Sequence, residues 1–334
     1  MASLNETEVQ DLYTFAIDLA RKAGRAIVDG SSRRFSTPAS ASSFDHKKNT
    51  ADLVTETDQA VEALVKKEIS TKYPHHNFIG EESWAAGEEN GIPDNGVVWI
   101  VDPIDGTTNF VHAFPYTCIS IGIVVDKVTT IGVVYAPFMD TLYHAAKGKG
   151  AYISSPHFQT PRKLPLTDPA PLENINQALV AFEWGSDRRS EILSKKLSSF
   201  AKITGDPTGG VIGGKMAQGV RSLGSAALNF CHVASGNLDL YWEIGCWAWD
   251  VCAGVVIAQE AGAAVVGSQK HANEVIDDQG TEQDAKFNLV TTQVLTGRKY
   301  VVVRAIDGQN KSNNVKAQKH LLKEFYSCVD EWDP

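Results

Sequence analysis

The chain has 334 residues, which at roughly 100–200 residues per domain predicts two domains or one large α/β body. Its composition, with 43% hydrophobic and 21% charged residues, excludes a collagen-like or wholly disordered chain. The 40 acidic and 31 basic residues give a formal net charge of −9, and no block of like charge departs from that balance. A protein that binds the nucleic-acid backbone is therefore disfavoured.

Membrane and secretion signals are not expected. No apolar run approaches the roughly 20 residues that span a bilayer, and the first residues lack the basic and apolar regions of a signal peptide. The five cysteines are odd in number and have no CxxC spacing, which favours reduced thiols over a disulfide framework or a zinc cluster. We therefore expect a cytoplasmic protein with no membrane partner and no nucleic-acid partner.

Two helices are predicted first. Asn5, with Glu8 three residues later, is a typical N-cap pair, and apolar residues then recur at helical spacing until Gly30, which is expected to end the helix. Residues 31–43 are small and polar and predict a loop, either an inert linker or a lid. A second helix is predicted from Thr57 to the Tyr-Pro pair at 73–74.

Short β-like runs follow, separated by turn residues, and they predict a meander of antiparallel strands. The Pro-rich stretch 156–171 is expected to connect two halves, an N-terminal α+β half over 1–156 and a C-terminal α/β half over 157–334. The order of elements predicts a layered α+β architecture. The predicted strands are 97–101, 119–125, 131–135, 142–145, 178–182, 238–242, 264–266 and 300–304, and the predicted helices of the second half are 189–200, 225–235, 251–261 and 314–328.

The segment 99–110, WIVDPIDGTTNF, carries the strongest chemical signal. Asp102 and Asp105 stand three positions apart across a proline-containing turn, so both carboxylates can face one point, and the carbonyl of Ile104 adds a third oxygen. Hard oxygen ligands of this kind suit Mg²⁺ or Mn²⁺ rather than zinc. The amides of Gly106 and Thr107 can hold a phosphate at the start of a helix.

Carboxylates beside a phosphate site would repel the phosphate unless cations lay between them, so this segment indicates metal-dependent phosphoryl chemistry. The alternative is an ordinary pair of Asp-Pro and Asp-Gly turns. Two further acids also follow apolar runs. Taken alone, Glu81, in GEES, could equally be a solvated surface acid. Asp250, in WDVCAG, taken alone could equally be a helix N-cap.

Taken together, these segments resemble the inositol monophosphatase family. GEES at 80–83, DPIDGTTNF at 102–110 and WDVCAG at 249–254 occur in the family's order and with similar spacing. DLVTETD at 52–58, LGSAALN at 223–229 and Glu243 seven residues before Asp250 extend the likeness from the first helix nearly to the last. The resemblance implies a layered αβαβα sandwich of the inositol monophosphatase and sugar phosphatase type.

The resemblance implies two Mg²⁺ ions and a third that is held more weakly near Glu81. Glu81, Asp102 and the carbonyl of Ile104 would hold the first ion. Asp102, Asp105 and Asp250 would hold the second, with Asp102 shared between the two.

The same resemblance implies how water is activated and how phosphate is held. Glu81 and Thr107 would position and deprotonate the attacking water, with Asp58 orienting the Thr107 hydroxyl. The amides of Gly106 and Thr107 would bind phosphate oxygens.

Substrate contacts are implied as well. Glu243, Asp250 and the turn that contains Ser225 and Ala226 would contact the hydroxyls of a polyol. Lys47 matches a lysine that the family carries on a mobile loop, close to the third ion.

The expected reaction is Mg²⁺-dependent hydrolysis of myo-inositol monophosphate to myo-inositol and phosphate by metal-activated water, without a phosphoenzyme. The family also implies a homodimer and sensitivity to lithium. One alternative is a phosphatase of the same superfamily acting on a 3′,5′-bisphosphate nucleotide, histidinol phosphate or a sugar phosphate. Another is a catalytically silent, metal-binding regulatory relative. Residues 247–249, Trp-Ala-Trp, replace the family's more usual His-Cys-Trp, which puts fine specificity in doubt.

Overall fold

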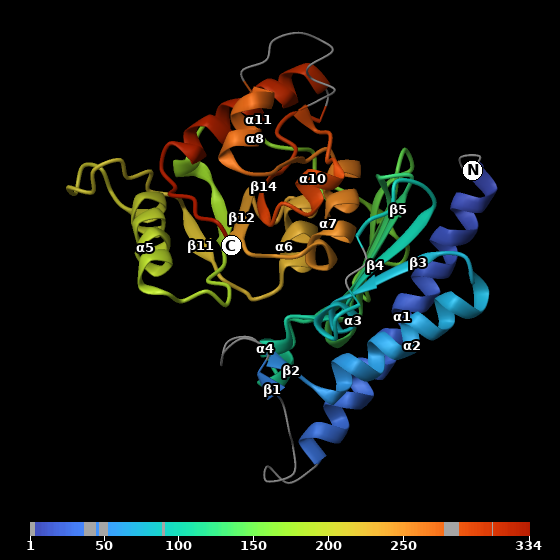
Figure 1. Cartoon of the computed structure of the whole chain (residues 1–334). Coiled ribbons are helices and arrows are strands. Elements are labelled where there is room, and N and C mark those ends of the chain that lie inside the picture. The colour runs from blue at the N-terminus through green and yellow to red at the C-terminus, as the bar shows by residue number, and fades with distance from the viewer. Residues whose placement is uncertain (1–3, 37–44, 47–52, 89–90, 277–286, 309) are drawn as a thin grey trace.

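Two long helices begin the chain in the computed structural model, which describes residues 4–36, 45–46, 53–88, 91–276, 287–308 and 310–334. Helix α1 (Glu6–Ser36) and helix α2 (Glu56–Lys72) pack side by side against one face of a sheet (Figure 1). The backbone N–H of Glu8 donates to Asn5 Oδ1 at 3.0 Å, and that of Asn5 donates to Glu8 Oε2 at 2.8 Å. The predicted N-cap pair is confirmed.

The predicted end of the first helix at Gly30 is wrong, because α1 continues to Ser36. Gly30 is buried, and a Cβ atom there would lie 2.3 Å from Cγ2 of Thr57 in α2. The glycine therefore allows two helices to approach closely instead of ending one of them. Residues 31–36 of the predicted loop are helical, and residues 37–43 lie outside the described residues.

The predicted meander is confirmed as part of a seven-stranded sheet with the order β3-β4-β5-β6-β7-β8-β9. β3 runs parallel to β4, and every other pair of neighbours is antiparallel. A separate two-stranded pair is formed by β1 (Asp45–His46) and β2 (Leu53–Val54). The strands of the large sheet are β3 (Asn77–Gly80), β4 (Val97–Asp105), β5 (Cys118–Val125), β6 (Val128–Ala136), β7 (Thr141–Ala146), β8 (Gly150–Ser154) and β9 (Arg162–Lys163).

A second sheet of five strands has the order β11-β10-β12-β14-β13 and contains the four strands predicted for the second half. β10 pairs in parallel with β11 and β12, whereas β14 is antiparallel to both β12 and β13. These strands are β10 (Leu179–Phe182), β11 (Gly219–Arg221), β12 (Leu240–Ile244), β13 (Ala264–Val266) and β14 (Lys299–Val303).

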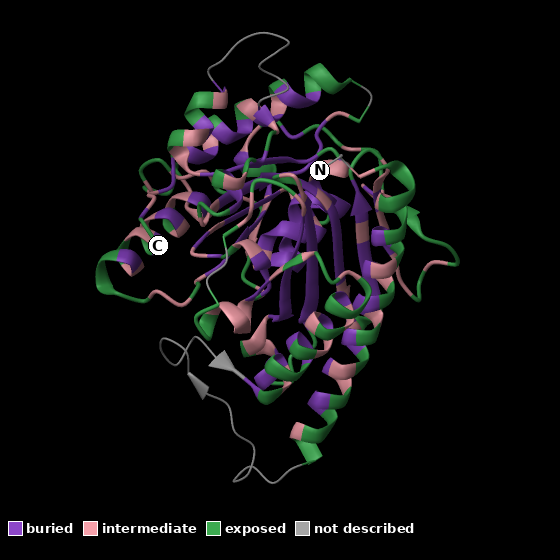
Figure 2. Cartoon of the chain, turned by 45° about the vertical axis from the view of Figure 1, so that its right-hand side comes forward, coloured by how far each residue is buried: buried purple, intermediate pink, exposed green. Residues whose placement is uncertain are grey.

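Five layers result, in the order helices, sheet, helices, sheet, helices, which confirms the layered α+β fold. α6 (Ala226–Ser235) and α7 (Ala248–Glu260) lie between the two sheets, and α5 (Ser190–Thr204), α8 (Gln269–Ile276) and α11 (Lys311–Tyr326) pack on the outer face of the second sheet. Three separate apolar cores fill the spaces between layers. Figure 2 shows the buried residues gathered on the strands and inner helix faces.

Strand alternation divides the side chains of β4 between two of these cores. Trp99 points toward α1 and α2, whereas Val98 and Ile100 point toward α6 and α7. The predicted boundary after residue 156 stays a prediction. β9 and α7 both follow that position, yet β9 extends the first sheet and α7 packs across it.

Shorter elements complete the described chain: α3 (Glu81–Ala85), α4 (Thr107–Val111), α10 (Thr292–Leu295) and two 3₁₀ turns, η1 (Pro137–Met139) and η2 (Ile175–Gln177). All five cysteines are buried and free. Among the described helices, none combines the length and the apolar character that crossing a bilayer requires.

Candidate metal centre

Three aspartates from two elements meet at one point between the first sheet and the inner helices. Asp102 and Asp105 stand near the end of β4, and Asp250 lies in the first turn of α7. Each offers a carboxylate oxygen, and the three oxygens lie within 4.8 Å of one another. Asp102 and Asp105 are buried and Asp250 is half-buried. The structure thus brings together three acids that the sequence presents in two distant motifs.

A bulge in β4 explains how Asp102 and Asp105 reach the same point. In a regular strand, residues three apart point to opposite faces. Here Asp102 pairs with Ser120 and Asp105 with Cys118, so β4 contains one residue more than β5 over this stretch. The extra residue turns both carboxylates to one side. The backbone N–H of Ile104, inside the bulge, donates to Asp102 Oδ1 at 2.9 Å.

The gathered acids disfavour their own ionisation. Burial, followed by the charges of Glu81, Asp105 and Asp250, raises the pKa of Asp102 well above its usual value. Burial also raises the pKa of Asp250, and it raises the pKa of Asp105 to about 6. Like charges held this closely in a buried place are costly without a compensating cation.

Asp105 is fixed by the start of α6. Its Oδ2 accepts a hydrogen bond from Ser225 Oγ at 2.6 Å and from the backbone N–H of Ala227 at 2.7 Å. Ser225 is the N-cap of α6 and is 1% exposed. Its hydroxyl is therefore committed to Asp105, and the predicted contact of Ser225 and Ala226 with substrate would have to come from their backbone amides.

Glu81 is the first residue of α3, directly after β3. Its charge contributes to the raised pKa values of Asp102, Asp105 and Asp250, which places it beside the three aspartates. Glu81 directly follows β3, whereas Asp102 and Asp105 lie in the last part of β4, and β3 and β4 are parallel neighbours.

Glu62 of α2 holds the start of α3, and the sequence analysis missed it. This buried carboxylate accepts hydrogen bonds from the backbone N–H groups of Glu82 and Ser83, both at 2.7 Å, and from Ser83 Oγ at 2.6 Å. The one available signal was its position four residues after Asp58, on the same face of α2.

The Thr107 hydroxyl lies between two other predicted site residues, Ile104 and Asp58. Its Oγ1 lies 3.0 Å from the carbonyl oxygen of Ile104 and 3.1 Å from Asp58 Oδ1, so its hydroxyl can donate to either. Asp58 is buried in the first turn of α2, where its other oxygen accepts from the N–H and hydroxyl of Thr55, and burial raises its pKa to about 6. Gly106, just before Thr107, has φ 93°, and a Cβ there would lie 3.0 Å from two backbone carbonyl oxygens.

Glu243 lies on β12, where the Tyr241 hydroxyl donates to its Oε2. Burial, followed by the charge of Glu183, raises the pKa of Glu243 to about 8. Near neutral pH this carboxyl therefore keeps its proton and can donate a hydrogen bond to a ligand hydroxyl.

Glu183 is a second carboxylate that sequence reasoning missed. It is buried directly after β10 and accepts hydrogen bonds from the backbone N–H groups of Leu223 and Gly224, from Asn229 Nδ2 and from Ser222 Oγ. It thereby holds the turn that leads into Ser225. An acid directly after an apolar run was the available signal, the same one that identified Asp102.

Lys47, predicted on a loop, lies outside the described residues.

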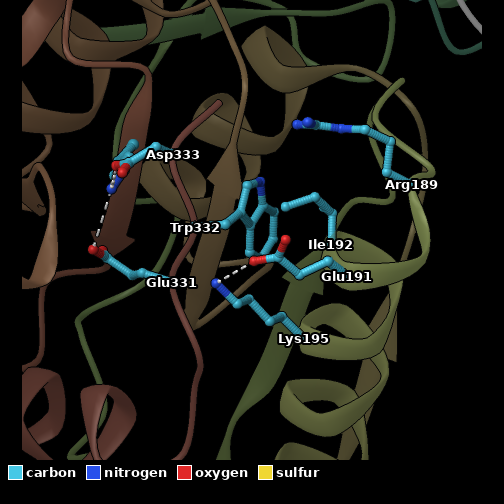
Figure 3. A pocket seen from close by; sticks show the side chains of 8 residues that line it. Arg189, Glu191, Ile192, Lys195, Glu331, Trp332 and Asp333 are labelled. Carbon is cyan, nitrogen blue, oxygen red and sulfur yellow. Dashed lines mark hydrogen bonds and ion pairs between the residues drawn. The ribbon is translucent and has the colours of Figure 1, made fainter.

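A hollow of about 310 Å³ lies elsewhere, between α5 and the C-terminal segment (Figure 3). Within it Lys195 pairs with Glu191 at 3.5 Å and Lys299 with Asp333 at 2.8 Å, whereas Arg189 pairs with Asp187 outside the hollow. It shares no residue with the acidic centre.

The chain is similar to known proteins in both sequence and fold. The family model described as "Inositol monophosphatase family" matches residues 8–315. Protein qutG of Emericella nidulans is 37% identical over 334 residues, covering 98% of this chain and 96% of the relative. Inositol monophosphatase 1 of Homo sapiens is 39% identical over 257 residues, covering 77% and 83% of the two chains. The crystal structure of inositol monophosphatase II from Staphylococcus aureus MSSA476 superposes with a TM-score of 0.64 at 27% identity, covering 96% of this chain and all of that one (100%).

Proposed function

This chain belongs to the inositol monophosphatase family, and from that premise we propose that it hydrolyses myo-inositol monophosphate with the help of Mg²⁺. Homologues in the family are phosphatases that release phosphate from monoesters. The observation that carries the proposal is the cluster of Asp102, Asp105 and Asp250 beside the linked pair of Thr107 and Asp58.

The donor set fits Mg²⁺. Three closely spaced carboxylates that repel one another supply hard oxygens. One oxygen of each already accepts a backbone hydrogen bond, so each carboxylate has a second oxygen to offer to a cation. Glu81 and the Ile104 carbonyl would complete the set for two to three ions. When bound, such ions lower the pKa of water and neutralise charge on the phosphoryl oxygens.

We infer that Thr107 and Glu81 prepare the attacking water. The Thr107 hydroxyl, oriented by Asp58 and by the Ile104 carbonyl, would hold the water in line with the ester bond, and the Glu81 carboxylate would take its proton. The water oxygen then bonds to phosphorus while the ester P–O bond breaks, and the departing alkoxide takes a proton from solvent. No side chain becomes phosphorylated in this scheme.

The leaving group would lie against the second half of the chain. Glu243, Asp250 and the backbone amides at 225–226 would contact its hydroxyls, and the protonated Glu243 would donate one of these hydrogen bonds. The amides of Gly106 and Thr107 would bind phosphate oxygens. A homodimer and inhibition by lithium stay predictions from the family, and a cytoplasmic location stays a prediction from the sequence.

A second candidate is a regulatory protein that keeps the metal centre without turnover. Its support is that protein qutG, whose name gives no enzymatic activity, matches 98% of the chain, whereas human inositol monophosphatase 1 matches 77%. A third is hydrolysis of another small phosphate ester, because residues 247–249 differ from the family's usual sequence.

A phosphate-release panel separates these candidates. Inositol 1-phosphate, a nucleotide 3′,5′-bisphosphate, fructose 1,6-bisphosphate and histidinol phosphate should be compared with Mg²⁺ and with EDTA. We expect Mg²⁺-dependent release with the highest kcat/KM for inositol 1-phosphate. A higher value for another ester would replace the substrate, and Mg²⁺ binding without release from any ester would favour the regulatory candidate.

A further inference from the structure

Three tryptophans form a stack beside the acidic centre, which we call the tryptophan stack: Trp84, Trp247 and Trp249. The rings of Trp247 and Trp249 are parallel within 14°, with centroids 5.2 Å apart. The Trp84 ring lies 6.0 Å from Trp247 and 5.9 Å from Trp249, tilted by 50° and 55°. Aromatic pairs at these separations attract each other beyond the area that they bury.

The tryptophan stack joins the two helices that carry the acidic residues outside β4. Trp84 stands three residues after Glu81 in α3, and Trp247 stands three residues before Asp250 at the start of α7. Residues three apart share a helix face, so the Trp84 indole lies on the side of α3 that carries Glu81, whereas Trp247 is the N-cap of α7 and lies just before its first turn. The backbone N–H of Trp247 also donates to Asp250 Oδ2 at 2.5 Å.

Arg298 ties the tryptophan stack to the second sheet. Its guanidinium carbon lies 3.9 Å from the Trp247 ring centroid, a close cation–π contact. Its Nη2 donates to the carbonyl of Gly245 at 2.8 Å, and the backbone N–H of Gly245 donates to the Arg298 carbonyl at 2.8 Å. The turn that leads into α7 is thereby fastened to the start of β14.

Helix α3 depends on such contacts, because its five residues are too few to be stable alone. Glu62 holds its first turn, and the tryptophan stack holds the side that faces α7. We propose that the tryptophan stack, supported by Arg298, positions Glu81 relative to Asp250, so that the two acids can bind neighbouring divalent cations. The inference rests on the proposed metal-dependent function and adds positioning residues to it.

Metal affinity and folding can be separated here. Trp247 is 38% exposed and Trp84 is half-buried, so truncating either ring removes little of a closed core. Groups that orient metal ligands typically change metal affinity by about 10–100-fold when they are removed. A purely structural ring would change the melting temperature of the metal-free protein and leave the affinity unaltered.

The test is calorimetric titration of the full chain with Mg²⁺ alone. We expect Trp84→Leu and Trp247→Leu each to raise the Kd about tenfold, and the double variant to do no more than the weaker-binding single, because both substitutions break the same contact. Trp84→Phe, which keeps an aromatic ring, should stay within about threefold of wild type. The matched control is Phe158→Leu, which removes a partly buried ring 5.5 Å from the guanidinium of Arg162, away from the acidic centre.

The outcomes separate this inference from the function beneath it. A wild-type chain that binds no Mg²⁺ would remove the proposed function itself. Wild-type binding together with an unchanged Kd in Trp84→Leu, or with effects that add in the double variant, would overturn the positioning role alone. If Trp84→Leu fails to fold, Trp247→Leu, at a more exposed site, is the deciding variant, and an unchanged Kd in it overturns the positioning role. The melting temperatures of all metal-free variants are measured alongside.

Discussion

Replacing Asp102 by asparagine should stabilise the metal-free protein and abolish its response to Mg²⁺. The carboxylate oxygens of Asp102, Asp105 and Asp250 lie within 4.8 Å. At that distance two unit charges repel by about 3.5 kcal/mol at an effective dielectric constant near 20. The acids relieve part of this repulsion by keeping protons, as their raised pKa values indicate, so we expect a net gain of about 1–2 kcal/mol near pH 7.5.

The sign of the pH dependence follows from those raised pKa values. A carboxyl whose pKa is higher in the folded state than in the unfolded chain penalises folding once the unfolded chain can ionise, above about pH 4. The advantage of Asp102→Asn should therefore be absent at about pH 4 and grow as the pH rises. Asparagine keeps an oxygen that can accept the hydrogen bond from the Ile104 N–H, so the bulge is expected to persist.

Urea unfolding in EDTA and again in saturating Mg²⁺ measures both effects. Metal at 100 times its Kd should stabilise the wild type by about 2.7 kcal/mol and leave the variant unchanged, so the order of stability reverses when Mg²⁺ is added. Asp94→Asn, at an exposed site paired with Lys127, is the control that should follow the wild type. A variant that loses more than about 1 kcal/mol in EDTA, or that Mg²⁺ stabilises as much as it does the wild type, would refute the reasoning.

Three further changes test other parts of the site. Thr107→Val removes the hydroxyl that contacts Asp58 and should lower kcat about 10²–10⁴-fold while Mg²⁺ affinity is retained. Thr107→Ser should keep activity. A loss of kcat below tenfold for Thr107→Val in steady-state assays would contradict the role given to the hydroxyl. Glu243→Gln removes a carboxyl whose pKa of about 8 penalises folding from about pH 4.3 upward. The stability advantage of the variant should therefore grow by at most about 1.4 kcal/mol per pH unit and level off above pH 8. A constant advantage in urea unfolding between pH 5 and 8 would count against this. The same variant should raise KM for inositol phosphate more than for a small aryl phosphate. Glu183→Ala deprives four hydrogen-bond donors of their acceptor and should lower the free energy of unfolding by about 3–5 kcal/mol, measured by thermal unfolding. The control is Glu191→Ala, at an exposed site. A loss below about 1 kcal/mol for Glu183→Ala would show that water replaces the carboxylate.

The features that could be predicted from the sequence depend on patterns that span many residues. Apolar runs indicated eight strands of the two sheets, β4–β7, β10 and β12–β14, but not β3, β8, β9 or β11. Helical spacing indicated α2, α5, α6, α7 and α11. The acids that cluster could be found because each follows an apolar run, where a chain leaves a sheet and exposes polar side chains. Their meeting at one point depended on the bulge in β4, and a spacing of three residues alone cannot distinguish a bulge from a turn.

The unpredicted part depends on contacts between distant single residues. Gly30 was expected to end a helix, because a glycine in sequence does not reveal that Thr57 lies against it. Glu62 and Glu183 resemble ordinary surface acids until the backbone N–H groups that they accept from are in place. The approach of Trp84 to Trp247 likewise follows from the packing of α3 against α7 and from no local pattern.

The donor set of the metal centre depends on the middle helical layer, α6 and α7. Asp105, from the first sheet, is held by the start of α6, and Asp250 lies on α7, so the cluster of three aspartates forms only after α6 and α7 have packed against the first sheet. A nascent or truncated chain that ends before residue 250 would present an incomplete donor set. Cation binding would thus require α7 to be in place, and fragments that lack it would be inert toward phosphate esters.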